Sequence, residues 1–371
     1  MLEEDWDLLV GFFPANWQWL ATRTKALKGL HGDRSPANAL RVLLMHVGGG
    51  MSLRETAVRA RESAVADLSD VAILKRLRKS KNWLRQLCLK LFRERGVPLG
   101  RTTGRQVRVF DATTVKEPGR TGSLWRIHYS VQLPSLTCDY FQVTGTAGEG
   151  TGESFRRFPV GAGDHILADR GYSVGPGIEY VASNGAFVCV RVNSQSLCMQ
   201  DADGDSFVLV DHLRTVTRPG EAVCWPVQVT GREGAPIQGR LCAVRKTQTA
   251  IDATIKRLRR LASKKGTEIQ PATLVVAEYV ILFTTFPTET FSPVDVLLWY
   301  RMRWQVELVF KRFKQIAQLG HLPKHGTESS QAWLYGKLFV ALLTEKIISH
   351  ATTLSPWGYE LEARTHPEPM A

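Results

Sequence analysis

Three acidic side chains are placed where they could hold a divalent metal ion over a phosphate group. Asp111 and Asp169 follow the apolar runs "VRVF" and "HILA", which are typical of buried strands, and Glu307 lies in the amphipathic segment "YRMRWQVELVFKRFK". Phosphodiester chemistry uses hard oxygen ligands that hold one or two Mg²⁺ ions at the scissile phosphate. Two carboxylates on adjacent strands, with a third on a helix packed against the sheet, would supply such a set.

The segment around Glu307 places several polar groups on one helical face. With Tyr300 at zero and about 100° per residue, Arg303 lies at about 300°. Glu307 follows at about 340° and Lys314 at about 320°, so the four side chains share a face about 60° wide. This face suits a metal ligand flanked by phosphate-binding cations, and a solvated, salt-bridged face is the alternative.

Each acid also has an ordinary explanation when it is taken alone. An aspartate at a strand end often caps a turn, and a glutamate on a helix often pairs with a nearby lysine or arginine. Glu149 and Glu153 could assist a metal site, or they could be solvated turn residues. The functional interpretation therefore depends on the elements that would bring the acids together.

Alternating apolar residues predict the strands that position the two aspartates. "QVRVFDATTV" is predicted to be a strand that ends at Asp111, and "WRIHYSVQL" and "CDYFQVTG" are predicted to follow as two more strands. "DHILADRGYS" predicts a short strand that stops at Asp169, followed by a helix near "GIEYVASNG" and the strand "AFVCVRV". Three meandering strands followed by alternating strands and helices indicate an α/β or α+β core.

Residues 193–275 resemble a mostly β insertion. They contain the strand-like pieces "SFVLVDHL", "AVCWPVQVTG" and "IQGRLCAVRK", and then the basic stretch "KRLRRLASKKG". "YVILFTTF" returns to a buried-strand pattern. Ser292 and Pro293 then start the helix that contains Glu307, with Asp295 in its first turn. A last helix is predicted from about Ser329 to Ser349.

The first hundred residues are predicted to be helices separated by turns. Ser35 and Pro36 suit the start of one helix, "SLRE" from Ser52 is a capping box for the next, and further starts are predicted near Ser69 and Ser80. The span 52–80 could be a helix-turn-helix whose second helix enters a DNA groove, or a helical bundle that only packs.

Composition favours a polyanionic partner. Forty-eight Lys and Arg against thirty-five Asp and Glu give a net charge of +13, and the pI is near 9.6. From Lys75 to Arg108 there are twelve basic residues and one acid, which predicts either phosphate contacts or a solvated face. The acidic first residues and the absence of a long apolar run predict a cytoplasmic, nucleoid-associated protein. Six cysteines without a CxxC pair predict free, buried thiols.

The spacing of Tyr300, Arg303, Glu307 and Lys314 resembles the Y-R-E-K signature of the DDE transposases of the insertion-sequence-four group, which are bacterial cut-and-paste transposases. "FDATTVKEPGRTGSLWRIHYS" and "ILADRGYS" resemble the first and second aspartate segments of that group. The resemblance extends from about residue 35 to 350, with the three motifs in the correct order. It implies a ribonuclease-H-like mixed sheet with flanking helices, a β-rich insertion before the catalytic helix, and an N-terminal helical domain.

By the same resemblance, Asp111, Asp169 and Glu307 would be the catalytic metal ligands for two Mg²⁺ ions, for which Mn²⁺ can substitute. Tyr300, Arg303 and Lys314 would contact the transposon-end DNA. The partners would be double-stranded DNA, as transposon ends and target, and a second copy of the chain in a synaptic complex. Little more than fifty residues follow Lys314, so no large C-terminal dimerisation domain is expected and the mode of pairing stays open.

Two other readings remain beside a transposase: a metal-dependent DNA nuclease of the same fold, and an inactive or domesticated DNA-binding derivative. The predicted organisation is the same for all three. It comprises an N-terminal helical, DNA-binding region at 1–104, a first part of the core at 105–192, the insertion at 193–275, a second part of the core with the catalytic helix at 276–350, and a tail at 351–371.

Overall fold

The computed structural model describes residues 3–32, 34–94, 107–116, 124–133, 137–146, 152–232, 235–303, 322 and 326–353. Contacts between Cα atoms divide the chain into two compact units. Unit 1 comprises Met1–Arg95 with Arg312–Ala371, and unit 2 comprises Gly96–Lys311. Each unit is considered by itself below.

Unit 1 is built of helices that begin at the expected capping residues. Ser35 caps α3, and Ser69 caps α5. Ser52 and Glu55 form the capping box of α4, with N···O distances of 2.7 and 3.2 Å. These predicted starts are therefore confirmed. The helices are α1 Glu3–Val10, α2 Trp17–Arg23, α3 Pro36–Val47, α4 Leu53–Glu62, α5 Asp70–Lys79, α6 Lys81–Glu94 and α13 Thr327–Thr353.

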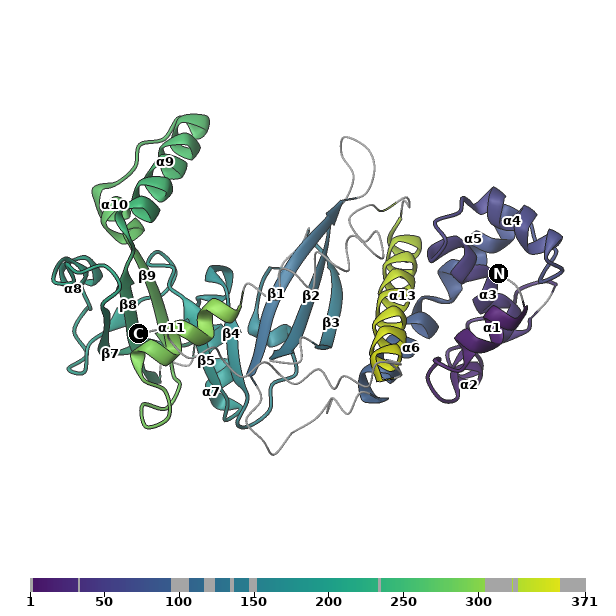
Figure 1. Cartoon of the computed structure of the whole chain (residues 1–371), viewed down its shortest axis with the longest axis horizontal. Helices are drawn as coiled ribbons and strands as arrows, with labels where there is room; N and C mark the ends of the chain where they lie inside the picture. The colour runs from purple at the N-terminus through teal and green to yellow at the C-terminus, as the bar shows by residue number, and fades with distance from the viewer. Residues whose placement is uncertain are drawn as a thin grey trace. The chain divides into compact units, whose positions relative to one another are not determined.

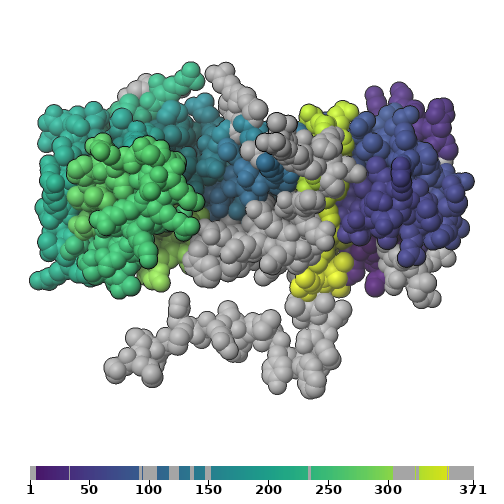
Figure 2. All heavy atoms as spheres, turned by 90° about the horizontal axis from the view of Figure 1, so that it is seen from above, coloured from purple at the N-terminus to yellow at the C-terminus, as the bar shows by residue number. Residues whose placement is uncertain are grey.

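The C-terminal helix α13 packs among the N-terminal helices. It contacts α3, α5 and α6, and its yellow atoms lie against the purple and blue atoms of the N-terminal helices in Figure 2. Residues 332–339 are buried without interruption, so this stretch of the helix is buried around its whole circumference, as in the centre of a helical bundle. The sequence pattern placed this segment in the catalytic core, whereas the contacts place it in unit 1.

Part of the basic run from Lys75 to Arg108 serves contacts inside the protein. Arg76 is buried and donates to the carbonyl oxygen of His31 at 2.9 Å. Lys79 Nζ donates to the carbonyl oxygen of Lys28 at 2.6 Å. Because these groups are already engaged, the run is not a uniform phosphate-binding face.

Unit 2 contains a nine-stranded sheet of order β3-β2-β1-β4-β5-β9-β8-β7-β6 (Figure 1). The strands are β1 Val107–Lys116, β2 Leu124–Leu133, β3 Thr137–Gly145, β4 His165–Ala168, β5 Phe187–Arg191, β6 Met199–Gln200, β7 Ala222–Thr230, β8 Pro236–Arg245 and β9 Tyr279–Thr284. The helices are η1 Phe155–Arg157, η2 Arg170–Tyr172, α7 Gly175–Ser183, α8 Leu209–Arg214, α9 Gln248–Lys265, α10 Pro271–Ala277 and α11 Pro293–Met302.

The first five strands form the mixed sheet that the resemblance implies. β1, β2 and β3 are an antiparallel meander, and β4 and β5 add in parallel to β1. β9, β8, β7 and β6 then extend the same sheet in antiparallel order. The strands β6, β7 and β8 of the insertion are thus continuous with the sheet that carries the two aspartates. This architecture agrees with the expected ribonuclease-H-like α/β core.

The segment 193–275 was predicted to be mostly β, but through α8, α9 and α10 it holds more helical than strand residues. Two local predictions were also wrong. β1 does not end at Asp111 but continues to Lys116, because β2 pairs with it over its whole length. The piece "SFVLVDHL" was predicted to be a strand, but its second half begins the helix α8. Leu209 and Leu213 are both buried, and their spacing of four residues suits one face of a helix.

Aromatic side chains fill the core beneath β1 and β4. Phe110 and Phe158 stack with ring centroids 4.0 Å apart, and Phe155 lies beside Phe110 and Tyr172. All four rings are buried, so the first half of β1 and the end of β4 rest on a closely packed layer.

Neither a membrane-spanning helix nor a disulfide was expected from the sequence. None of the helices of the described residues is both long and apolar enough to cross a bilayer. The six cysteines are free, as expected, but Cys198 is exposed and Cys224 is half-buried.

Candidate active site

Asp111 and Asp169 lie side by side in unit 2. β4 runs parallel to β1 with Phe110 beside Ala168, so the next residue of each segment brings Asp111 beside Asp169. Neighbouring strands are about 4.8 Å apart, and residues in register point to the same face. The structure therefore brings together the two aspartates that the sequence analysis selected, although one lies within a strand and the other follows a strand.

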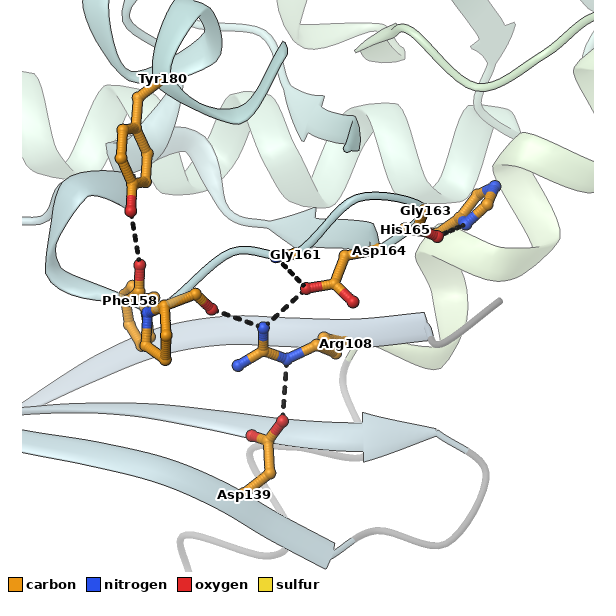
Figure 3. Close-up of polar contacts among 9 residues, drawn as sticks. Arg108, Asp139, Phe158, Gly161, Gly163, Asp164, His165 and Tyr180 are labelled. Carbon is orange, nitrogen blue, oxygen red and sulfur yellow. Dashed lines mark hydrogen bonds and ion pairs between the residues drawn. The ribbon is translucent and has the colours of Figure 1, made fainter. Parts of the chain in front are cut away.

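A buried guanidinium supports the alignment of β1 with β4 (Figure 3). Arg108 Nε donates to Asp139 on β3 at 2.8 Å, and Nη1 donates to Asp164, directly before β4, at 2.9 Å. Nη1 also donates to the carbonyl oxygen of Pro159 at 2.7 Å. The side chains of Arg108, Asp139 and Asp164 are 7, 3 and 4% exposed. Arg108 therefore joins β1, β3 and the start of β4 through a dry ionic contact.

Neighbouring donors orient the carboxylate of Asp111. Its Oδ1 accepts from the N–H of Ala112 at 2.7 Å, and its Oδ2 accepts from the hydroxyl of Tyr129 at 3.2 Å. Tyr129 lies directly opposite on β2. Burial raises the pKa of Asp111 and the charge of Asp169 raises it further, whereas Ala112, Arg303 and Tyr129 oppose the rise. A cation would relieve the repulsion between the two aspartates.

Asp169 shapes the turn that follows β4. Its Oδ1 accepts from the N–H of Gly171 at 2.9 Å, and it caps the short helix η2. A Cβ on Gly171 would collide with the carboxylate of Glu153 and would lie 3.2 Å from Asp169 Oδ1. The glycine of "DRGY" therefore permits Glu153 to approach Asp169 closely.

Glu153 is a third carboxylate near the two aspartates. Burial raises its pKa, and the charge of Asp169 is the next largest cause of the rise. Arg126 on β2 opposes this change, and Asp111 adds to it. For Glu153 the structure thus favours a place at the site over a solvated turn. Glu149 lies outside the described residues.

The hydroxyl of Tyr172 is an orphaned polar atom next to these acids. It is buried and has no hydrogen-bond partner among the described residues. The pKa of Tyr172 is raised well above its usual value, first by burial and then by the charges of Asp111, Glu153 and Asp169. Buried polar atoms are nearly always satisfied, so an orphaned hydroxyl near three carboxylates fits a site that a hydrated cation completes.

Helix α11 begins as predicted at Ser292 and Pro293. Ser292 and Asp295 form a capping box, with N···O distances of 2.9 and 3.2 Å between them. The helix leads directly to Tyr300 and to Arg303, which is its C-cap. The capping residues therefore set where the helix starts, and this start determines which turn of the helix carries Tyr300 and Arg303.

Arg303 reaches Asp111, and Tyr300 lies beside Arg303. Arg303 Nη1 lies 3.7 Å from Asp111 Oδ2, and the guanidinium is 5.7 Å from the centre of the Tyr300 ring. Burial raises the pKa of Tyr300 to about 12. The charge of Arg303 acts to lower this pKa, and the charge of Asp169 acts to raise it. Four of the six residues selected from the sequence therefore share one site. Glu307 and Lys314 lie outside the described residues.

The described residues do not form a complete metal cage. No group of three His, Cys, Asp or Glu side chains among them is arranged to hold an ion. Asp111 and Asp169 offer hard carboxylate oxygens of the kind that divalent cations prefer, and they would need at least one further ligand.

The sequence comparisons place this site in a family. Residues 102–343 match the family described as the transposase DDE domain. The chain belongs to the DDE transposases. InsL, assigned as a transposase of the insertion sequence element IS186A of Escherichia coli K12, is 32% identical over 361 residues, which cover 95% of this chain and 96% of InsL. The transposase of element IS421 of Escherichia coli is 32% identical over 362 residues, with the same coverage.

A transposase of element IS231F from Bacillus thuringiensis subsp. israelensis is 26% identical over 126 residues, or 34% of this chain and 26% of that protein. Among solved structures, the alignment with the catalytic domain of human endonuclease V covers 62% of this chain and 98% of the endonuclease chain. Its TM-score of 0.27 and identity of 13% are too low to inform the fold. The family match and the full-length relatives identify a bacterial DDE transposase of the insertion-sequence-four group.

Membership in this family indicates the substrate on which the enzyme acts and the kind of ion that the family uses. The transposase is an enzyme that acts on DNA, and DDE domains generally work with divalent metal ions.

Sequence reasoning did not select Tyr129 or Tyr172. The alternation in "WRIHYSVQL" shows that Tyr129 shares a face with every second residue of β2, but its position opposite Asp111 depends on the strand register.

Proposed function

We propose that the transposase binds the terminal inverted repeats of its own insertion sequence and performs Mg²⁺-dependent cut-and-paste transposition. Asp111, Asp169 and Glu307 would hold two Mg²⁺ ions. The observation that carries the proposal is the parallel register that sets Asp111 beside Asp169, next to the orphaned hydroxyl of Tyr172. When bound, the ions supply activation of the attacking oxygen and charge stabilisation of the leaving oxygen.

The other side chains hold the carboxylates and the DNA in place. Tyr129 and the N–H of Ala112 keep the oxygens of Asp111 in a defined orientation. Arg303 Nη1 lies 3.7 Å from Asp111 Oδ2. Because a guanidinium binds phosphate well in a bidentate manner, Arg303 can turn to a phosphate oxygen when DNA enters. Tyr300 and Lys314 would add contacts to the transposon end.

The reaction would proceed without a covalent protein intermediate. Water attacks the phosphorus at the end of the element, the bond to the bridging 3′ oxygen breaks, and a free 3′-hydroxyl results. This hydroxyl then attacks a second phosphodiester, on the opposite strand or in target DNA. Two copies of the transposase would hold two ends in a synaptic complex, as in other proteins that act symmetrically on DNA.

A cleavage assay on a labelled transposon end tests the metal ligands. Asp111→Asn, Asp169→Asn and Glu307→Gln keep the size of each side chain but remove its charge. Loss of several kcal/mol of transition-state stabilisation should lower Mg²⁺-dependent cleavage by about 10³-fold or more while end binding persists. Chelation with EDTA should have the same effect on the unmodified protein. Asp211→Asn, at an exposed position of α8, is the matched control and should cut normally.

Cleavage by any of the three variants at the unmodified rate would remove that residue from the ligand set. A second assay separates the transposase from a plain nuclease. The protein should join a precut, labelled end to a target duplex, whereas hydrolysis without joining would favour a metal-dependent nuclease of the same fold.

A further inference from the structure

Helices α9 and α10 form a projection from the sheet that the site above does not use. α9 spans 18 residues and ends at Gly266, whose φ of 62° suits the left-handed conformation of a helix C-terminus. α9 packs against α10, which in turn contacts α8 and β9. Within α9 only Ile251 is buried, and the helix extends away from the strands in Figure 1. Most of its surface is therefore available to a partner.

The second half of α9 is strongly basic. Residues 256–265 include six lysines and arginines and no acid. Asp252, in the first half, accepts a hydrogen bond from Gln248 at 2.9 Å. The six cations are exposed, and none makes an ion pair with another described residue. The six are Lys256, Arg257, Arg259, Arg260, Lys264 and Lys265.

The row of like charges destabilises α9 as a helix on its own. Lys256 and Arg260 are four residues apart, as are Arg260 and Lys264, and like charges at that spacing destabilise a helix. Asp252 lies four residues before Lys256, and no carboxylate of the described residues forms an ion pair with Arg260 or Lys264. An anionic partner would offset the repulsion between these cations.

Four of the six cations of α9 lie on a different face from its two leucines. With Lys256 at zero and about 100° per residue, Arg260 lies at about 40° and Lys264 at about 80°. Arg259 lies at about 300°. Leu258 and Leu261 lie at about 200° and 140°, and both line a cavity beneath the helix. The four cations therefore form an outer face, and the row from Lys256 to Lys264 rises about 12 Å along the axis.

The cavity beneath α9 extends the positive surface toward the active site. It has a volume of about 640 Å³ and is bounded by α8, α9, α10 and β9. Its lining includes Arg170, Arg191, Lys246 and Arg257 and no aspartate or glutamate among the described residues. Arg170 directly follows Asp169. The described lining is therefore basic from Arg170, which follows the candidate metal ligand Asp169, to Arg257 in α9.

We infer that the outer face of α9, defined by Lys256, Arg259, Arg260 and Lys264, binds the phosphate backbone of the duplex DNA next to the scissile phosphate, without reading its sequence. Lysine and arginine side chains bind phosphates through charge, and such contacts position DNA without specifying bases. The green atoms of this segment face the viewer in Figure 2 and are not covered by the rest of unit 2. The inference rests on the action of the transposase on DNA and not on the identity of the metal ligands.

Salt-dependent DNA binding by the full-length protein tests this face. The triple variant Lys256→Gln, Arg260→Gln, Lys264→Gln removes three charges, and glutamine is a good helix former. The control variant Arg214→Gln, Arg218→Gln, Arg232→Gln removes the same charge from exposed positions of unit 2 outside α9. Circular dichroism shows whether both variants keep their helices.

Binding is measured with a labelled transposon-end duplex and with an unrelated duplex of equal length. For the α9 variant, the slope of log Kobs against log salt concentration should become shallower by about 2.7 on both duplexes, because each phosphate contact contributes about 0.9. The control variant should keep the slope of the unmodified protein. An unchanged slope, or an equal change in the control, overturns the inference.

A change confined to the transposon-end duplex would show that the face reads sequence, and would also overturn it. The Asn and Gln variants of the proposed metal ligands should keep the unmodified slope. A wrong ligand assignment therefore appears as surviving cleavage, and a wrong α9 assignment appears as an unchanged salt slope.

Discussion

At the scale of single residues, the orientation of Asp111 depends on a neighbour on another strand. The Tyr129 hydroxyl donates to Asp111 Oδ2 at 3.2 Å from a buried position. In Tyr129→Phe the ring still fills its space, but the carboxylate loses one donor. A hydrogen bond to a charged group contributes about 1.5–3 kcal/mol, so cleavage of a transposon end should fall by about 10-fold or more.

Tyr180→Phe is the matched control for this change. The Tyr180 hydroxyl donates to the carbonyl oxygen of Phe158 at 3.0 Å (Figure 3) and makes no hydrogen bond to a carboxylate of the described residues. Single-turnover cleavage by this variant should match that of the unmodified protein. Equal rates for both Phe variants would show that Tyr129 does not orient Asp111 for the reaction.

The residues that sequence reasoning found differ in kind from those that it missed. Asp111 and Asp169 follow apolar runs, and Tyr300 and Arg303 belong to a spaced motif, so their types and positions are visible in the chain itself. Glu153, Tyr129 and Tyr172 come to the site through strand register and a close approach at Gly171. These relations join residues that are distant in sequence, and a single sequence does not show them.

At the scale of elements, Arg108 is the contact that holds three segments of the sheet together. Arg108→Met should lower the free energy of unfolding by about 3–5 kcal/mol, because removal of one partner leaves the buried carboxylates of Asp139 and Asp164 without their cation. Urea unfolding, followed by circular dichroism, measures the change. Arg218→Met, at an exposed position, should alter stability by less than about 0.5 kcal/mol. A similar small effect for Arg108→Met would contradict a supporting role for this contact.

The elements themselves were predictable where a local signal specifies them. Ser52 and Ser292 each begin a helix because their side chains and the acids three residues later satisfy the first free N–H groups. The end of β1 was not predictable in this way, because pairing with β2 carries it past Asp111 to Lys116. The helices that α13 contacts were not predictable either, because helical periodicity alone does not identify the partners of a buried helix.

At the scale of the whole molecule, the proposed cut-and-paste reaction requires that two ends be processed together, while the candidate site of a chain sets Asp111 beside Asp169. We therefore expect that a dimer is the active species on DNA. Mixing the unmodified protein with an equal amount of Asp111→Asn, with transposon ends in excess, should leave about one quarter of the dimers fully active if both copies must be competent. Independent monomers would instead retain about half of the activity.

The dependence on mixing ratio makes this test sharper. At three parts of Asp111→Asn to one part of unmodified protein, cooperative dimers should retain about one sixteenth of the paired-end cleavage, and monomers about one quarter. The readout is the release of the element from a substrate with two labelled ends. Asp211→Asn, mixed in the same ratios, should leave release unchanged, because this exposed residue of α8 lies outside the candidate site. A linear fall in release with the fraction of Asp111→Asn would contradict an obligate dimer and would assign cleavage of each end to a single chain.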